Sequence, residues 1–153
     1  MHITRYTDYS LRTLMYLAVN GDELSTIRDI ADSYSISKNH LMKIVQQLSA
    51  KEYIQTVRGK NGGIKLNLNP AEINIGRLVR ELESDHSIVE CGGADNQCVV
   101  TPSCQLKNIF GEALNSFFNT LDAYSLADLV PMETEGNLRQ LLNITAAKKS
   151  DSV

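Results

Sequence analysis

The chain has 153 residues, of which 42% are hydrophobic and 22% are charged, and its formal net charge at pH 7 is −3. This composition is typical of a single globular domain or a small module with an extension, and it argues against a large single-core enzyme and a uniformly basic nucleic-acid coat. The charge is uneven, because residues 1–82 carry eleven Lys/Arg and eight Asp/Glu, whereas residues 83–153 carry four and ten. A front half that binds a polyanion therefore stays open.

The start of the chain, MHITRYT, has no apolar signal core, and the run LMYLAV is far shorter than the ~20 residues that cross a bilayer. We therefore expect a cytoplasmic bacterial protein with no membrane partner. Three cysteines, Cys91, Cys98 and Cys104, lie within fourteen residues. In a reducing compartment this cluster favours a metal or redox site over disulfide bonds.

Three apolar stripes at helical spacing follow one another at residues 11–18, 27–34 and 41–48. Thr26 with Asp29 predicts the start of the second helix, and Ser37 predicts the start of the third. Only SIS separates these two helices, which is typical of a helix-turn-helix. The segments YIQTV, RGKNGG and IKLNL then predict a β-hairpin with a glycine-rich tip. The predicted fold class is mainly α with a small β-hairpin, namely a winged helix-turn-helix domain over residues 1–82.

Residues 36–65 carry six Lys/Arg against one Glu, which predicts DNA binding by this module. We expect Asn39 and His40 to reach base edges in the major groove, and Arg58 to lie along the backbone or in the minor groove. The full predicted set is Ser37, Lys38, Asn39, His40 and Lys43 on the third helix, and Arg58, Lys60, Asn61, Gly62 and Gly63 on the wing. The alternative is an ordinary solvated hairpin turn beside surface lysines.

The segment IGRLVRELE predicts a fourth helix that ends near residues 83–85, followed by a cysteine-bearing loop over residues 83–104. Thr101 as N-cap and Pro102 at the first position predict a long helix of roughly twenty residues with a broad apolar stripe. We expect this helix, within residues 101–130, to pair with the same helix of a second subunit; the alternative is that it covers only its own winged domain. Residues 131–153 are predicted to be a C-terminal extension with a weak helix and a partly disordered tail.

The cysteine spacing contains no C-x-x-C pair, so it matches neither a zinc ribbon nor a thioredoxin-like site. Three thiolates could hold one face of an iron–sulfur cluster with a non-cysteine fourth ligand, and Cys104 is expected in the first turn of the long helix. The alternatives are three free thiols or a structural zinc that also uses His86. Spacing alone does not choose between iron–sulfur and zinc. A small iron–sulfur electron-transfer protein is the alternative from another functional class.

The segments YTDYSLRTLMYLA, SISKNHLMKIVQQL, VRGKNGGIKL, IGRLVRELE and SLADLV, together with the three cysteines, resemble the winged-helix iron–sulfur regulators over roughly residues 1–130. Within that family the resemblance is to the nitric-oxide-sensitive repressors. It implies a homodimer, not an enzyme, that carries one 4Fe-4S or 2Fe-2S cluster per subunit and binds palindromic operator DNA. Nitric oxide then nitrosylates the cluster and releases the operator, which derepresses nitrosative-stress genes.

The same resemblance bears on the fourth cluster ligand. Another branch of the family places a histidine three residues after the third cysteine, and Lys107 at that position argues against that branch. A regulator of the same fold that senses cluster supply, redox state or zinc stays an alternative. Members of the nitric-oxide-sensitive branch can use an aspartate of the first helix that reaches across the dimer, which corresponds here to Asp8.

Overall fold

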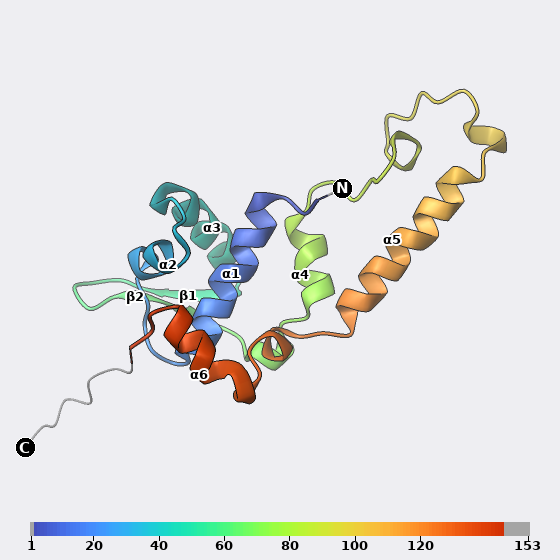
Figure 1. The fold of residues 1–153 in the computed structure, drawn as a ribbon. Coiled ribbons are helices and arrows are strands. Elements are labelled where there is room, and N and C mark those ends of the chain that lie inside the picture. The colour runs from blue at the N-terminus through green and yellow to red at the C-terminus, as the bar shows by residue number, and fades with distance from the viewer. Residues whose placement is uncertain (1, 146–153) are drawn as a thin grey trace, which may run out of the picture.

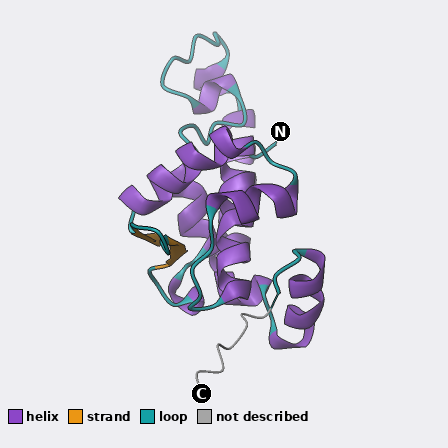
Figure 2. Cartoon of the chain, turned by 90° about the vertical axis from the view of Figure 1, so that its left-hand side faces the viewer, coloured by secondary structure: helices purple, strands orange, loops and turns teal. Residues whose placement is uncertain are grey.

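The computed structural model of the chain describes residues 2–145, and in this part helices form the body while the strands make one hairpin (Figures 1 and 2). The predicted fold class, mainly α with a small β-hairpin, is confirmed. The helices are α1 (Arg5–Asn20), α2 (Ile27–Tyr34), α3 (Lys38–Ala50), α4 (Ile75–Leu82), α5 (Leu106–Asp122) and α6 (Met132–Leu141), and the strands are β1 (Ile54–Val57) and β2 (Gly63–Leu66). No helix in residues 2–145 combines the length and apolar character needed to cross a membrane.

The helix-turn-helix is built as the sequence predicts. The Thr26 hydroxyl accepts a hydrogen bond from the Asp29 N–H at 3.2 Å, and the Asp29 carboxylate accepts one from the Thr26 N–H at 2.9 Å, which closes a capping box at the start of α2. Ser35 ends α2 in the left-handed conformation, with φ of 53°, and turns the chain into α3. Ser37 occupies the N-cap position of α3, but its side chain makes no capping hydrogen bond.

The wing is tied to the loop that precedes α2. The strands β1 and β2 pair antiparallel, and Ser25 extends the pairing: its N–H donates to the Ile64 carbonyl at 2.9 Å and its carbonyl accepts from the Ile64 N–H at 2.8 Å. Gly63 permits this approach, because a Cβ there would lie 2.7 Å from the Ser25 carbonyl oxygen. The orientation of the wing is therefore fixed by the helical body.

The main core lies among α1, α2, α3 and α4, and the C-terminal residues help to close it. Leu142 and Ile144 are 7% and 8% exposed, the Ser33 hydroxyl donates to the Leu142 carbonyl at 2.6 Å, and the Arg139 guanidinium donates to the Val19 carbonyl at 2.5 Å. Figure 1 shows α6 beside α1 accordingly. Residues 131–144 thus pack on the winged module. The tail predicted to be disordered is residues 145–153, of which 146–153 lie outside the described part of the chain.

The long helix begins later than the sequence predicts. Thr101 and Pro102 start a separate 3-10 turn, Thr101–Ser103, and α5 runs from Leu106 to Asp122 over 17 residues. The Thr101 hydroxyl donates to the Cys98 carbonyl at 2.8 Å instead of capping a helix, and Cys104 has an extended backbone. The prediction that Cys104 lies in the first turn of the long helix is therefore wrong, because the extended backbone breaks the helical path at that residue.

One end of α5 is joined to α4, and the other end extends away from the body (Figure 1). The Arg80 guanidinium donates to both oxygens of Asp122, at 2.6 and 2.7 Å, and the Asn74 amide donates to the Asp122 carbonyl at 2.7 Å. Gly76 makes this contact close, since a Cβ there would overlap the Asp122 carboxylate. Of the residues of α5, only Phe118 is buried.

Candidate functional site

The N-terminal half of α3 presents a polar face. Leu41, Ile44 and Val45 are buried in the core, which turns the opposite side of the helix to solvent. The residues of α3 and its N-cap that the sequence singles out are all exposed: Ser37, Lys38, Asn39, His40 and Lys43. Their side chains are therefore free to meet the groove of a double helix.

The predicted DNA-binding residues at the tip of the wing differ in exposure. Arg58, Lys60 and Asn61 are exposed, whereas Gly62 and Gly63 are half-buried. A Cβ on Gly62 would overlap the Val57 carbonyl oxygen, so this glycine is required by the hairpin itself. Contacts of Gly62 and Gly63 with DNA stay a prediction beside that structural role.

The three cysteines lie on the segment between α4 and α5, residues 84–105, and all are free. Cys98 is exposed, while Cys91 and Cys104 are half-buried. The Leu106 N–H at the start of α5 donates to Cys104 Sγ at 3.4 Å. Cys104 therefore lies directly before the N-terminus of α5 and not within its first turn.

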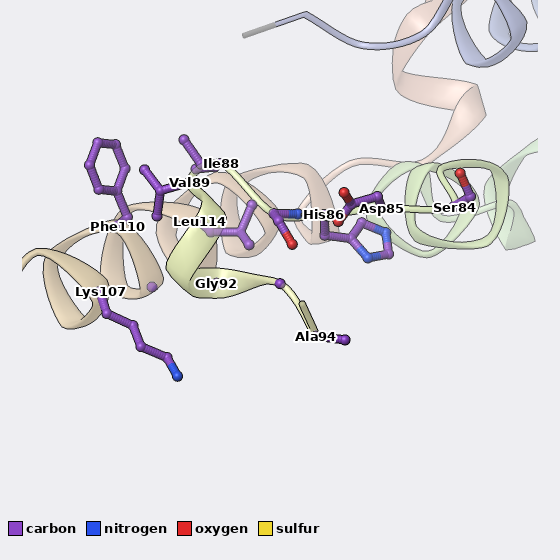
Figure 3. Close-up of a pocket in the computed structure, with 13 residues that line it drawn as sticks. Ser84, Asp85, His86, Ile88, Val89, Gly92, Ala94, Lys107, Phe110 and Leu114 are labelled. Carbon is purple, nitrogen blue, oxygen red and sulfur yellow. Dashed lines mark hydrogen bonds between the residues drawn. The ribbon is translucent and has the colours of Figure 1, made fainter. Parts of the chain in front are cut away.

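A groove of about 450 Å³ separates residues 84–94 from α5 (Figure 3). Lys107, Phe110 and Leu114 line it from α5. The His86 ring, also on its wall, meets Phe118 edge-on at 5.4 Å, and its Nε2 is buried without a hydrogen-bond partner among residues 2–145. The segment thus rests on α5 through mixed apolar and polar contacts and leaves space beneath it.

The proposed metal ligands are not brought together within one chain. Over the part of the chain that the structure describes, no three His, Cys, Asp or Glu side chains converge closely enough to hold a metal ion. Asp8 instead pairs with Arg12 one turn along α1, at 2.9 Å. A role for Asp8 across a dimer stays a prediction.

A hydrogen-bonded junction that the sequence does not reveal joins the cysteine segment to α1. Glu83, at the end of α4, accepts hydrogen bonds from the Thr4 N–H and the Thr4 hydroxyl, both at 2.9 Å. Partial burial alone would raise the pKa of Glu83, but hydrogen bonds from Thr7 and Thr4 hold it below its ordinary value. Thr4 is the N-cap of α1, so this carboxylate anchors the first turn of that helix.

The C-terminal end of α5, the helix that follows the segment, has a similar anchor. The Asp122 carboxylate is held by the Arg80 guanidinium, and their hydrogen bonds lower the pKa of Asp122. Arg80 also lies over the Phe118 ring at 4.3 Å from its centroid. No local pattern signals either junction, because the partners are 79 and 42 residues apart in the chain.

Comparison with known proteins agrees with this arrangement. Residues 3–132 match the Rrf2 family, described as iron-dependent transcriptional regulators. The chain is 48% identical to the HTH-type transcriptional regulator NsrR of Bacillus licheniformis, over 94% of this chain and all of that one. It is 52% identical to the regulator of the same name from Bacillus subtilis, over 85% of this chain and 90% of that one.

Solved structures share the fold. IscR from T. potens superposes with a TM-score of 0.68 at 21% identity, over 85% of this chain and 86% of that chain. The oxidized form of CymR from Staphylococcus aureus superposes with a TM-score of 0.67 at 24% identity, over 84% and 95%. The relatives named NsrR are transcriptional regulators, and the chain is accordingly a DNA-binding regulator and not an enzyme. The chain belongs to the Rrf2 family of iron-dependent transcriptional regulators.

Proposed function

We propose that the chain is an iron–sulfur-dependent repressor that releases operator DNA in response to nitric oxide. The observation that carries the proposal is the position of the three free cysteines, which share one short segment that follows the Glu83 junction and leads into α5, whose far end is held at Asp122. The resemblance of the sequence to nitric-oxide-sensitive repressors and the relatives named NsrR support it. Such a protein acts in the cytoplasm, where bacterial DNA lies.

The donor set fits an iron–sulfur cluster chemically. Cys91, Cys98 and Cys104 supply three sulfur ligands, and the Sγ atom of Cys104 accepts a hydrogen bond from the Leu106 N–H. These three residues would hold one 4Fe-4S or 2Fe-2S cluster per subunit. A carboxylate is a weak, exchangeable ligand for iron, which suits Asp8 of a second subunit as the fourth donor. When bound, the cluster would supply iron able to react with nitric oxide.

The residues around the segment give it two routes to the DNA-binding surface. Glu83 precedes the segment and holds the N-cap of α1, and α1 packs against α3. At the other end α5 leads to Asp122 and through Arg80 to α4. Rearrangement of the segment would therefore shift α1 and α4, and with them the spacing of the recognition helices.

The free face of α5 supports a homodimer. Leu106 and Ile109 are 47% and 59% exposed, and Phe110, Leu114 and Phe117 are only half-buried. An apolar stripe of this length on a projecting helix is stabilised when a second copy covers it. A two-fold dimer would place two recognition helices on a palindromic operator.

An anaerobic titration with nitric oxide tests this function. We expect visible absorbance in the purified protein, loss of that spectrum as nitric oxide is added, and release of a palindromic operator over the same range of concentration. A colourless protein with stoichiometric zinc would instead indicate a zinc regulator of the same fold. A coloured protein without preference for any operator would indicate an electron carrier.

Arg58→Ala should weaken operator binding. Arg58 is exposed at the wing tip and has no carboxylate within 4.0 Å among the described residues, so its charge is available to DNA. We expect an affinity loss of about 1–3 kcal/mol if the side chain enters a groove, measured by gel shift on operator and random DNA. An equal loss on both DNAs would contradict groove readout and leave Arg58 as a phosphate contact.

A further inference from the structure

Ion pairing divides the arginines of this chain into two groups. Of seven arginines, five have a carboxylate within 4.0 Å: Arg12, Arg28, Arg77, Arg80 and Arg139. The two without such a partner among the described residues are Arg58, at the tip of the wing, and Arg5, the first residue of α1. Both are exposed. Arg5 thus resembles Arg58, the predicted DNA-binding arginine, in being exposed without a nearby carboxylate, although it lies on a different element.

Arg5 borders a shallow groove next to the recognition helix. The groove has a volume of about 270 Å³ and lies between α1 and α3; its lining residues are Arg5, Tyr6, Tyr9, His40, Lys43 and Ile44. Its apolar surface comes from the tyrosine rings, Ile44 and the stems of the longer side chains. His40 and Lys43 belong to the predicted DNA interface, so the groove is continuous with that surface. No carboxylate lines it.

We propose that this groove binds the sugar–phosphate backbone of DNA beside the recognition helix, with Arg5 as the phosphate-binding residue. The inference rests on the proposed DNA-binding function and extends the interface from α3 and the wing to α1. An apolar recess rimmed by two cationic side chains and a histidine matches a polyanion whose deoxyribose rings are apolar and whose phosphates are charged. Arginine suits this role because its guanidinium can donate two hydrogen bonds to one phosphate.

The backbone at Arg5 is held in place by contacts within the chain. Thr4 caps α1 and is held by Glu83, so the helical turn that begins with Arg5 is anchored at its start. A contact made by a pre-positioned residue loses less conformational entropy on binding. A contact to phosphate also carries no sequence information, and we therefore expect it to act equally on any duplex.

The test compares Arg5→Ala with Arg77→Ala in the full-length protein, on operator and on random duplex DNA over a range of salt concentrations. Arg77 is the matched control, because it lies on α4 and pairs with Glu81 at 2.8 Å. Its replacement by alanine removes the same positive charge as Arg5→Ala. We expect Arg5→Ala to lower affinity about five- to tenfold on both DNAs. The slope of log affinity against log salt should fall by about one per subunit, whereas Arg77→Ala leaves it unchanged.

Circular dichroism of both variants checks that the helices are intact, and Arg5→Lys should restore most of the salt slope. An unchanged slope in Arg5→Ala would overturn the proposal, as would a loss confined to the operator, which would mean base contact. If the unsubstituted protein binds neither DNA, the proposed function itself is overturned. Measuring the unsubstituted protein beside the variants distinguishes that outcome from a failure of the Arg5 proposal alone.

Discussion

Anaerobically purified Cys98→Ala is expected to lack visible absorbance and to lose at least tenfold in operator affinity. Cys98 is exposed and lies between the other two cysteines in the sequence, so its replacement leaves Cys91 and Cys104 without disturbing the core. The variant would have two sulfur ligands and no replacement donor at position 98, so we expect the cluster to be lost. Absorbance spectra, iron analysis and a gel shift on the same preparation measure the effect.

Ser103→Ala is the matched control for this substitution. Ser103 lies on the same segment, next to Cys104, is exposed, and carries no sulfur ligand. It should retain the spectrum and the operator affinity of the unsubstituted protein. A Cys98→Ala protein that keeps its visible spectrum would remove Cys98 from the ligand set.

Gly76→Ala should destabilise the junction between α4 and α5. A Cβ at this position would overlap the Asp122 carboxylate and come within 2.9 Å of the Asp122 backbone nitrogen, so the end of α5 has to move. We expect a loss of about 1–3 kcal/mol in the free energy of unfolding, despite the better helix propensity of alanine. Urea unfolding followed by circular dichroism measures it.

Gly136 provides the comparison for Gly76. It is exposed on α6, and a Cβ there would meet nothing within 4 Å. Gly136→Ala should therefore leave stability unchanged or raise it by about 0.5–1 kcal/mol. Equal stability changes in the two variants would mean that the close approach of α5 to Gly76 has no energetic consequence.

The parts of the fold that depend on neighbouring residues could be predicted from the sequence. The capping box of Thr26 and Asp29, the apolar stripes of the first three helices and the turn chemistry of the wing all act over a few positions. The start of α5 could not be predicted in the same way. Pro102 occupies the first turn of a 3-10 segment as readily as that of an α-helix, and the extended backbone of Cys104 decides between them.

The candidate site divides along the same line. The exposed polar face of α3 follows from the burial of Leu41 and Ile44 at helical spacing, which the sequence contains. The hydrogen bonds between Thr4 and Glu83 join residues far apart in the chain, and nothing in the sequence around either residue indicates the other as its partner. The three cysteines, which the sequence suggests as ligands of one cluster, do not converge in the described structure, where no three metal-binding side chains come together within residues 2–145.

The length of α5 and its attachment at one end bear on how the cysteine segment could act on the winged module. Seventeen residues at about 1.5 Å each make a rod of roughly 25 Å, fixed at Asp122 and preceded at its opposite end by Cys104, while that end extends away from the body (Figure 1). If the proposed rearrangement displaces Cys104, a helix held at Asp122 would transmit that displacement to Arg80 and α4. A local rearrangement at the far end of α5 would then displace the residues of α4 that contact Asp122.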